Sequence, residues 1–169
     1  MQLVAPDSLT RPANPDDATL VFELYKQTPD YFRIISIPIP TLEEVKRELE
    51  VAKEDKRRYT ELILTQDLSS TIPDPKSGQF VVGYLDYKLD YPSVSDATVN
   101  LLLILENAQS KGLGRSCVTG LEKRLRGQTK RLLASIYGQN ERAKRFWQSL
   151  DYHFAIDAKP VLDWYAKAL

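Results

Sequence analysis

The sequence predicts a mixed α/β domain of the α+β type, in which a mostly antiparallel sheet is flanked by helices. Three observations lead to this class. Two amphipathic helical segments come first, strand-like segments then follow one another, and the chain ends with alternating strands and helices. The 169 residues show neither an internal repeat nor a linker, and this length suits one domain with a sizeable core. We therefore expect residues 1–169 to form a single domain.

Two helices are predicted near the start of the chain by their N-terminal residues. Asn14-Pro15-Asp16-Asp17 combines a capping residue, a proline suited to a first turn and acids that favour the helix dipole. Thr41-Leu42-Glu43-Glu44 is a capping box that opens the second helix. Apolar side chains follow at helical spacing: Leu20, Val21, Leu24 and Tyr25 in the first helix, and Leu42, Val45, Leu49 and Ala52 in the second. The prolyl and aromatic segment 29–40 between them is expected to be a loop.

Four strands are predicted next, over residues 59–66, 79–89, 94–105 and 130–137. Segment 69–78 holds two prolines, three serines and a glycine, so it is interpreted as a surface connection. A helix is expected over 112–126, with an apolar stripe that includes Cys117, and another helix begins at Asn140. Segments 152–157 and 160–168 can pair as terminal strands, although the second can equally be a short helix that starts at Pro160.

The turn from Gln109 to Gly114 is the most informative stretch, because it joins an apolar strand to an amphipathic helix. Gly112 and Gly114 allow the backbone to approach a ligand closely. The helix that follows offers free N–H groups and the positive end of its dipole, which together suit a phosphate group. The Gly-x-x-x-x-Gly-Lys-Ser/Thr pattern of nucleotide-binding P-loops is absent, which excludes that class.

Two motifs in order resemble one known family. Gln109 to Gly114 matches Gln/Arg-x-x-Gly-x-Gly/Ala. The second motif, Asn-x-x-Ala-x-x-Phe/Leu-Tyr followed by Leu-Gly-Phe/Tyr, is matched by Asn140, Ala143, Phe146, Trp147, Leu150, Asp151 and Tyr152. On these residues the chain resembles the GNAT superfamily of acetyl-CoA-dependent N-acetyltransferases, best over about residues 80–152. The resemblance implies a V-shaped splay between the strands predicted at 94–105 and 130–137.

The resemblance also implies where acetyl-CoA binds. Its pyrophosphate is expected on the backbone of residues 110–115, and its pantetheine arm is expected to pair with the strand that precedes them. Asn140 is either the cap of its helix or a donor to the pantetheine, and the two roles are compatible. The expected cofactor-binding residues are Leu102, Leu103, Ile104, Gln109, Ser110, Lys111, Gly112, Leu113, Gly114, Arg115, Asn140 and Trp147.

The implied reaction is acetyl transfer to a primary amine of a small molecule or peptide, by direct attack in a ternary complex. The chain departs from the family at two places: Trp147 stands where a tyrosine acid is usual, and Asn100-Leu101 where many relatives carry a glutamate. Asp86 and Tyr137 are therefore the candidate catalytic residues, with Asp90 next in line. A surface role for each stays open, and the alternative is a non-catalytic acyl-CoA-binding regulatory module of the same fold.

Segment 30–38 is unusually apolar for a loop, and it corresponds to a segment that often lines the acceptor pocket in the family. It can line a substrate cleft, pack on the core or meet a partner. Cys117 lies on the apolar stripe of its helix and is expected in the core. His153 is the single histidine and no ligand partners are evident, so no metal site is expected.

Composition excludes several other classes. The 23 basic and 23 acidic residues balance, which argues against a nucleic-acid binder that relies on a broad basic field. The longest apolar run, 101–105, is too short to cross a membrane. Residues 1–6 lack a basic region followed by an apolar one, and a single cysteine fits a reducing compartment. We expect a cytoplasmic protein; a homodimer stays open.

Overall fold

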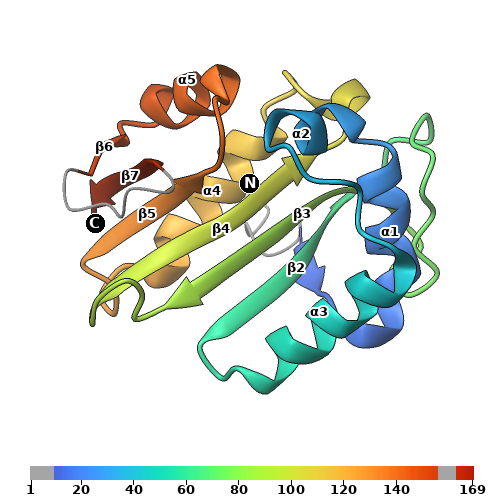
Figure 1. Ribbon diagram of the computed structural model, residues 1–169, viewed down its shortest axis with the longest axis horizontal. Helices are drawn as coiled ribbons and strands as arrows, with labels where there is room; N and C mark the ends of the chain where they lie inside the picture. The colour runs from blue at the N-terminus through green and yellow to red at the C-terminus, as the bar shows by residue number, and fades with distance from the viewer. Residues whose placement is uncertain (1–9, 156–162) are drawn as a thin grey trace, which may run out of the picture.

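A seven-stranded, open and curved sheet runs through the computed structural model, which describes residues 10–155 and 163–169 (Figure 1). The strand order is β1-β2-β3-β4-β5-β7-β6. All neighbouring strands pair antiparallel except β4 and β5, which are parallel. The strands are β1 (Thr10–Pro12), β2 (Arg58–Thr65), β3 (Phe80–Leu89), β4 (Asp96–Ile104), β5 (Arg131–Ile136), β6 (His153–Phe154) and β7 (Asp163–Ala168). The predicted fold class is confirmed.

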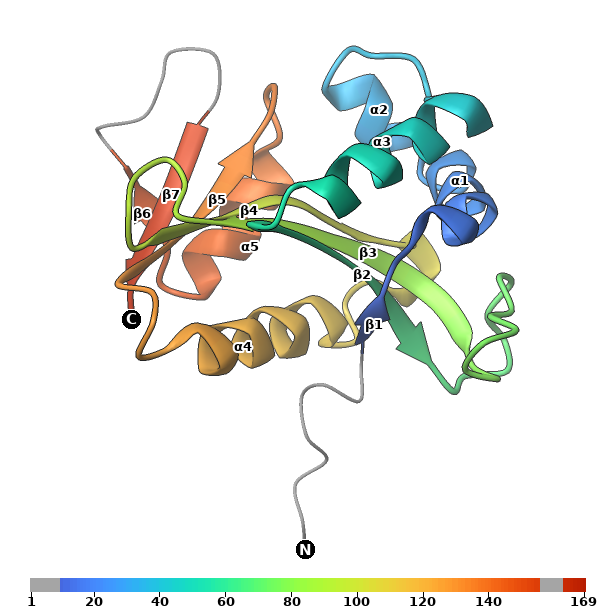
Figure 2. The ribbon, with the colours of Figure 1, turned by 90° about the horizontal axis from the view of Figure 1, so that it is seen from below.

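Helices cover both faces of this sheet (Figure 2). On one face lie α1 (Ala18–Lys26), α2 (Pro29–Ile34) and α3 (Leu42–Glu54). On the opposite face lie α4 (Leu113–Leu125) and α5 (Glu141–Ser149). Two short 3-10 helices, η2 (Pro15–Asp17) and η3 (Glu106–Ala108), precede α1 and follow β4.

The predicted helix starts are present as hydrogen bonds. Before α1, the backbone N–H of Asn14 donates to Asp17 Oδ2 at 2.8 Å. Before α3, the N–H of Glu44 donates to Thr41 Oγ1 at 3.2 Å, and the N–H of Thr41 donates to Glu44 Oε1 at 3.1 Å. The second pair is a complete capping box, so a local sequence signal alone was sufficient to place this helix.

Two elements differ from the sequence prediction. Segment 29–40 was expected to be a loop, but its first half is helix α2. Pro29 occupies the first turn, which proline favours, and the ring of Phe32 packs edge-on against Tyr25 with 5.1 Å between centroids. Strand β1 was not predicted, because three residues show no periodicity and its pairing partner, β2, lies some fifty residues away.

The predicted terminal strands agree with the described part of the chain. β6 and β7 pair antiparallel, with His153 opposite Ala166 and Phe154 opposite Tyr165. Residues 163–168 are therefore a strand rather than a helix. The rest of both predicted segments, over residues 156–162, lies outside the described residues.

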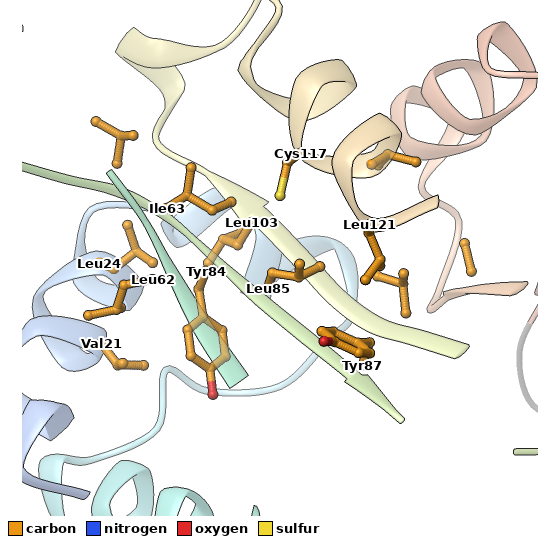
Figure 3. Packing of buried hydrophobic residues seen from close by; sticks show 14 of the residues in the cluster. Val21, Leu24, Leu62, Ile63, Tyr84, Leu85, Tyr87, Leu103, Cys117 and Leu121 are labelled. Carbon is orange, nitrogen blue, oxygen red and sulfur yellow. The ribbon is translucent and has the colours of Figure 1, made fainter. Parts of the chain in front are cut away.

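One hydrophobic cluster holds the sheet and its helices together. Buried side chains from α1, β2, β3, β4 and α4 meet in it, as the sticks of Figure 3 show. Val21 and Leu24 come from α1, and Cys117 and Leu121 come from α4. This packing on both faces fixes the helices relative to β4, the strand that borders the candidate site.

Strands β4 and β5 diverge after a short paired stretch, which is the predicted V-shaped splay (Figure 1). The pairing runs from Asp96 opposite Arg131 to Val99 opposite Ala134 and stops there, although β4 continues to Ile104. On the other edge of β4, Asp86 lies opposite Leu101 and Tyr87 opposite Val99. Asn100 is thus an extra residue, a β-bulge, and a bulge bends and twists its strand.

Candidate active site

A cavity of about 530 Å³ lies along the edge of β4, between α2 and the starts of α4 and α5. It brings together all the predicted cofactor-binding residues except Lys111. The lining comprises Thr28, Asp30, Tyr31, Ile34, Leu102, Leu103, Ile104, Glu106, Ala108, Gln109, Ser110, Gly112, Leu113, Gly114, Arg115, Asn140, Arg142, Ala143, Phe146, Trp147 and Ser149. Lys111 lies beside a smaller, neighbouring pocket, with its Nζ 3.7 Å from Asp67 Oδ2.

The edge of β4 offers backbone groups to this cavity. The N–H of Leu105 donates to Val82 O at 2.8 Å, so the alternation of an antiparallel pair directs the amides of Leu103 and Leu101 toward β3. By the same alternation, the amides of Leu102 and Ile104 point away from β3, toward the side of β4 on which the pairing with β5 has ended. Gln109 Nε2 donates to Ile104 O at 2.8 Å and anchors the following turn on this edge. An extended ligand with amide groups can therefore bind here as an added strand.

The turn before α4 forms one end of the cavity, and its backbone is suited to an anion. Ser110 and Gly112 both have left-handed backbone conformations, with φ of 63° and 80°. The first intrahelical bond runs from the N–H of Ser116 to Gly112 O at 3.0 Å. The N–H groups of residues 113–115 therefore have no acceptor within the helix, and these residues line the cavity. Free N–H groups and the helix dipole together favour a phosphate.

Helix α5 closes the cavity on the side of its aromatic residues. A Cβ atom on Gly114 would lie 3.1 Å from Phe146 Cε1, so the glycine permits close packing of α4 on α5. Trp147 is only 5% exposed, and its ring meets Phe146 and Tyr152 edge-on at 5.2 and 4.9 Å between centroids. Trp147 thus belongs to the core and also lines the cavity.

The structure shows one of the two predicted roles of Asn140, the cap of its helix. Its Oδ1 accepts a hydrogen bond from the N–H of Ala143 at 3.0 Å, so it caps α5. Asn140 also lines the cavity. Because the carboxamide oxygen serves the cap, the NH₂ group is the part that can bind a ligand.

Asp86 lies on β3 in a buried ion pair. The residue is 3% exposed, and its two carboxylate oxygens accept from Arg58 Nη2 at 2.6 Å and Arg58 Nε at 3.1 Å. Asn100 Nδ2 donates to Asp86 Oδ1 at 3.3 Å. Glu48 on α3 accepts from the same Arg58 Nη2 at 3.0 Å. The network holds two carboxylates for one guanidinium, so it keeps a net negative charge.

Two tyrosines lie where α2 meets the end of β5. Tyr137 follows β5 and is 40% exposed, and partial burial raises the pKa of its hydroxyl. Tyr31 lines the cavity, and burial, with Tyr137 and Glu48 nearby, raises its pKa to about 12. Both hydroxyls therefore stay protonated near neutral pH and can donate hydrogen bonds. The sequence did not single out Tyr31 by itself. Its place in the cavity lining depends on α2, which the sequence did not predict as a helix.

Asp86 and Tyr137 are not among the residues that line the cavity, and neither are three other candidates. Asp90 lies in the turn after β3 with φ of 51°, and its Oδ1 accepts from the N–H of Ser95 at 3.0 Å. Cys117 is 4% exposed, and burial raises the pKa of its thiol to about 12, so it belongs to the core as predicted. His153 is exposed on β6.

The described residues contain neither a metal-binding cluster nor a membrane-spanning helix. Among residues 10–155 and 163–169, no three or more His, Cys, Asp and Glu side chains gather in a group able to hold a metal ion. Within the same ranges, none of the helices has the length and apolar composition that crossing a membrane requires.

Comparisons with known proteins agree on one family. The family model "Acetyltransferase (GNAT) family" matches residues 32–152. The structure of an acetyltransferase from Thermus thermophilus is similar to this chain, with a TM-score of 0.79 and 40% sequence identity over 95% of this chain and 96% of that chain. No curated protein is similar to the chain at a significant level.

Two more distant solved structures share the fold. RimL, a ribosomal L7/L12 α-N-protein acetyltransferase in complex with coenzyme A, has a TM-score of 0.74 and 13% identity over 99% of this chain and 98% of that chain. AAC(6')-Ib in complex with ribostamycin and coenzyme A has a TM-score of 0.72 and 15% identity over 95% of this chain and 92% of that chain.

Proposed function

Because the chain belongs to the GNAT family of acetyltransferases, we propose that it transfers the acetyl group of acetyl-CoA to a primary amine of a small molecule or peptide. The observation that supports this best is the cavity itself. It joins a row of open backbone amides on β4 to the free N–H groups at the start of α4. Acetyl-CoA has the matching sequence of groups: an amide-bearing arm followed by a pyrophosphate.

The residues of the cavity fit acetyl-CoA as a co-substrate. The N–H groups of residues 113–115 would bind the pyrophosphate, with the Arg115 side chain adding positive charge. The backbone amides of Leu102 and Ile104 would pair with the pantetheine arm. The Asn140 NH₂ group would donate to the same arm. When bound, acetyl-CoA supplies an activated acyl carbon and a thiolate leaving group.

The acceptor amine must lose a proton before it attacks, since an alkyl ammonium has a reference pKa of about 10.4. We propose that it enters between segment 31–38 and β3. The exposed side chains of Ile34 and Ile37 would exclude water from it, and the net negative network around Asp86 would attract its cationic form. The proton then passes onward through water or the Asp86 carboxylate.

Tyr137 is the proposed hydrogen-bond donor to the departing sulfur. Its hydroxyl is protonated near neutral pH, because burial raises its pKa. It stands at the end of β5, on the side of the splay opposite β4. Attack of the neutral amine on the acyl carbon would then proceed directly in the ternary complex. As the carbon–sulfur bond breaks, the attacking nitrogen releases its extra proton to water, and the thiolate takes up a proton from the Tyr137 hydroxyl, which water reprotonates.

Two proteins of the same fold support the proposed acceptor class. RimL acts on a protein α-amine, and AAC(6')-Ib was solved with ribostamycin, a small molecule. The fold thus serves both kinds of acceptor, and a panel for this chain should contain small amines and peptides. Release of the coenzyme A thiol, followed with a thiol reagent, measures turnover. Amine-dependent release supports the proposal.

A second candidate function is an acyl-CoA-binding regulatory module without catalysis. Two observations favour it: Trp147 replaces the usual tyrosine acid, and both oxygens of the Asp86 carboxylate already accept from Arg58. The same panel separates the two functions. A chain that binds acetyl-CoA, but releases no thiol with any amine, small or peptide, is the regulatory module.

The proposed role of Asp86 is tested by Asp86→Asn. The substitution removes the charge and keeps an oxygen that can accept a hydrogen bond. We expect kcat/KM for the amine to fall by about tenfold or more, because the cation is no longer attracted, with acetyl-CoA affinity nearly unchanged. The pH dependence of kcat/KM should also change. A variant that matches the wild type in both respects would show that Asp86 takes no part in acceptor binding or proton transfer.

A further inference from the structure

The V-shaped splay begins at one residue, and that residue has a side-chain partner. Asn100 is the extra residue of β4, between Val99, the last to pair with β5, and Leu101, which pairs with β3. Immediately beyond it begins the open edge that lines the cavity. The position of Asn100 therefore sets the direction in which the cavity edge of β4 runs.

The partner of Asn100 is itself held rigidly. Asp86 Oδ1 accepts from Asn100 Nδ2 at 3.3 Å. Arg58 donates to the same carboxylate from Nη2 at 2.6 Å and from Nε at 3.1 Å. A two-pronged guanidinium–carboxylate contact fixes the orientation of the carboxylate as well as its position. The Asp86 carboxyl is 95% buried, so solvent does not compete for it.

The network continues to a helix. Arg58 Nη2 also donates to Glu48 on α3, at 3.0 Å. Side chains of α3, β2, β3 and β4 thus form one continuous set of contacts from Glu48 through Arg58 and Asp86 to Asn100. The bulge is thereby tied to elements that pack in the core, rather than left to the local preference of β4.

We propose that Asp86 and Arg58 hold Asn100 in the bulge, so that Asn100 is a positioning residue that directs the open edge of β4 toward the pantetheine arm of acetyl-CoA. This inference rests on the proposed function, because it concerns the same cavity. A bulge is an inserted residue, and a register shift moves every following side chain and amide. Without the Asn100 contact, the backbone amides of Leu102 and Ile104 are no longer held in the orientation that faces the cavity. The backbone of the turn at residues 110–115 keeps its conformation.

The test compares two ligands that differ in the pantetheine arm. Acetyl-CoA uses both the β4 edge and the α4 turn, whereas 3′-phospho-ADP has the pyrophosphate and no arm. In Asn100→Leu, which is nearly isosteric but has no donor, we expect acetyl-CoA to bind about five- to tenfold more weakly, as the loss of one or two hydrogen bonds predicts. The affinity for 3′-phospho-ADP should change by less than about twofold, a value within the spread of surface effects.

Thr98→Val is the matched control. Thr98 lies on the same strand, is fully buried, and donates from Oγ1 to Tyr91 O at 2.6 Å. Its substitution also removes one hydrogen bond from β4, but outside the bulge. Both ligands should bind this variant as they bind the wild type, while its melting temperature falls as that of Asn100→Leu does.

Asp86→Asn serves as the conservative variant, since an amide oxygen still accepts from Asn100. It should keep the wild-type affinity for acetyl-CoA, and Asp86→Leu should lose affinity as Asn100→Leu does. Asn100→Leu that binds acetyl-CoA like the wild type, or that weakens both ligands equally, overturns the role of Asn100. A wild-type chain that does not bind acetyl-CoA overturns the proposed function as well, so the two failures are distinct.

Discussion

At the scale of single residues, one backbone angle at Gly112 shapes the proposed pyrophosphate site. A Cβ atom there would meet nothing within 4 Å, so space is not the constraint. The constraint is φ of 80°, where a side chain costs about 1–2 kcal/mol and a β-branched one more. We expect Gly112→Val to rearrange the turn and to weaken acetyl-CoA binding by at least about tenfold, as the loss of two or more N–H contacts predicts. Titration calorimetry measures the acetyl-CoA affinity of the variant and of the wild type.

Gly78 provides the control for Gly112. Its φ is 73°, and a Cβ atom there also meets nothing within 4 Å, but it lies in the connection between β2 and β3. Gly78→Val should strain the backbone by a similar amount, lower the melting temperature similarly and leave acetyl-CoA affinity intact. Equal affinities for Gly112→Val and the wild type would contradict the assignment of the pyrophosphate to this turn.

Trp147 is a second case in which the residue type decides the role. An indole N–H donates hydrogen bonds but has no proton to release near neutral pH, and the ring is packed between Phe146 and Tyr152. We expect Trp147→Phe to change turnover by less than about tenfold, and Trp147→Tyr to raise it. General acid catalysis contributes about 10²–10⁴-fold. A loss above about a hundredfold in a folded Phe variant that still binds acetyl-CoA would contradict a packing role.

At the scale of elements, helix α5 depends on Asn140 at its start, and the cap and the ligand contact can be separated. Asn140→Ala removes both, so it should lose about 1 kcal/mol of stability together with acetyl-CoA affinity. Asn140→Ser keeps an oxygen for the N–H of Ala143 and has no NH₂ group. We expect it to melt near the wild-type temperature and to bind acetyl-CoA several-fold more weakly. Wild-type affinity in the serine variant would leave Asn140 with the cap alone.

Helix α2 is the element that most changed the interpretation of the site, because the sequence predicted a loop there. As a loop, segment 29–40 was a candidate wall of the acceptor cleft only. As a helix, it places Tyr31 and Ile34, with Thr28 at its N-cap, in the lining of the cavity. Its backbone also lies against the turn after β5, where a Cβ on Gly138 would approach Ile34 O to 2.7 Å. The proposed acceptor and cofactor sides therefore meet at this helix.

At the scale of the whole molecule, one buried ion pair ties together three segments that are distant in sequence. Arg11 on β1 donates from Nε and Nη2 to both oxygens of Asp74, each at 2.8 Å, and also to Asp17 of η2. The guanidinium holds the pKa of Asp74 well below its usual range. A depressed carboxyl pKa stabilises the fold fully above the unfolded value of 3.8, and the stabilisation is lost as the pH falls below it.

Unfolding by urea at several pH values tests this tie. The wild type should lose stability steeply below about pH 4, where unfolded carboxylates take up protons. Asp74→Asn should be less stable by about 1.5–3 kcal/mol at pH 7, the range for hydrogen bonds to charged groups. Its stability should fall less with acid, so the two curves approach each other as the pH falls below about 4. Parallel curves from pH 7 to pH 3 would mean that Asp74 contributes no pH-dependent stability.

Local signals were enough to predict much of the fold and the turn before α4. The capping box at Thr41 and the turn from Gln109 to Gly114 act within a few residues, through hydrogen bonds and backbone angles that the side chains themselves favour. The helical stripe containing Cys117 predicted a core face for the same reason. Such features hardly depend on what the rest of the chain does.

The surroundings of the proposed reacting groups depend on the tertiary structure. The order of helices and strands, and the turn that suits a phosphate, could be predicted from the sequence. The pairing of β1, the bulge at Asn100 and the contact of Arg58 with Asp86 join residues that lie far apart along the chain. Such contacts cannot be predicted from a periodic pattern in the sequence, because their energies come from burial and from partners that only folding brings together.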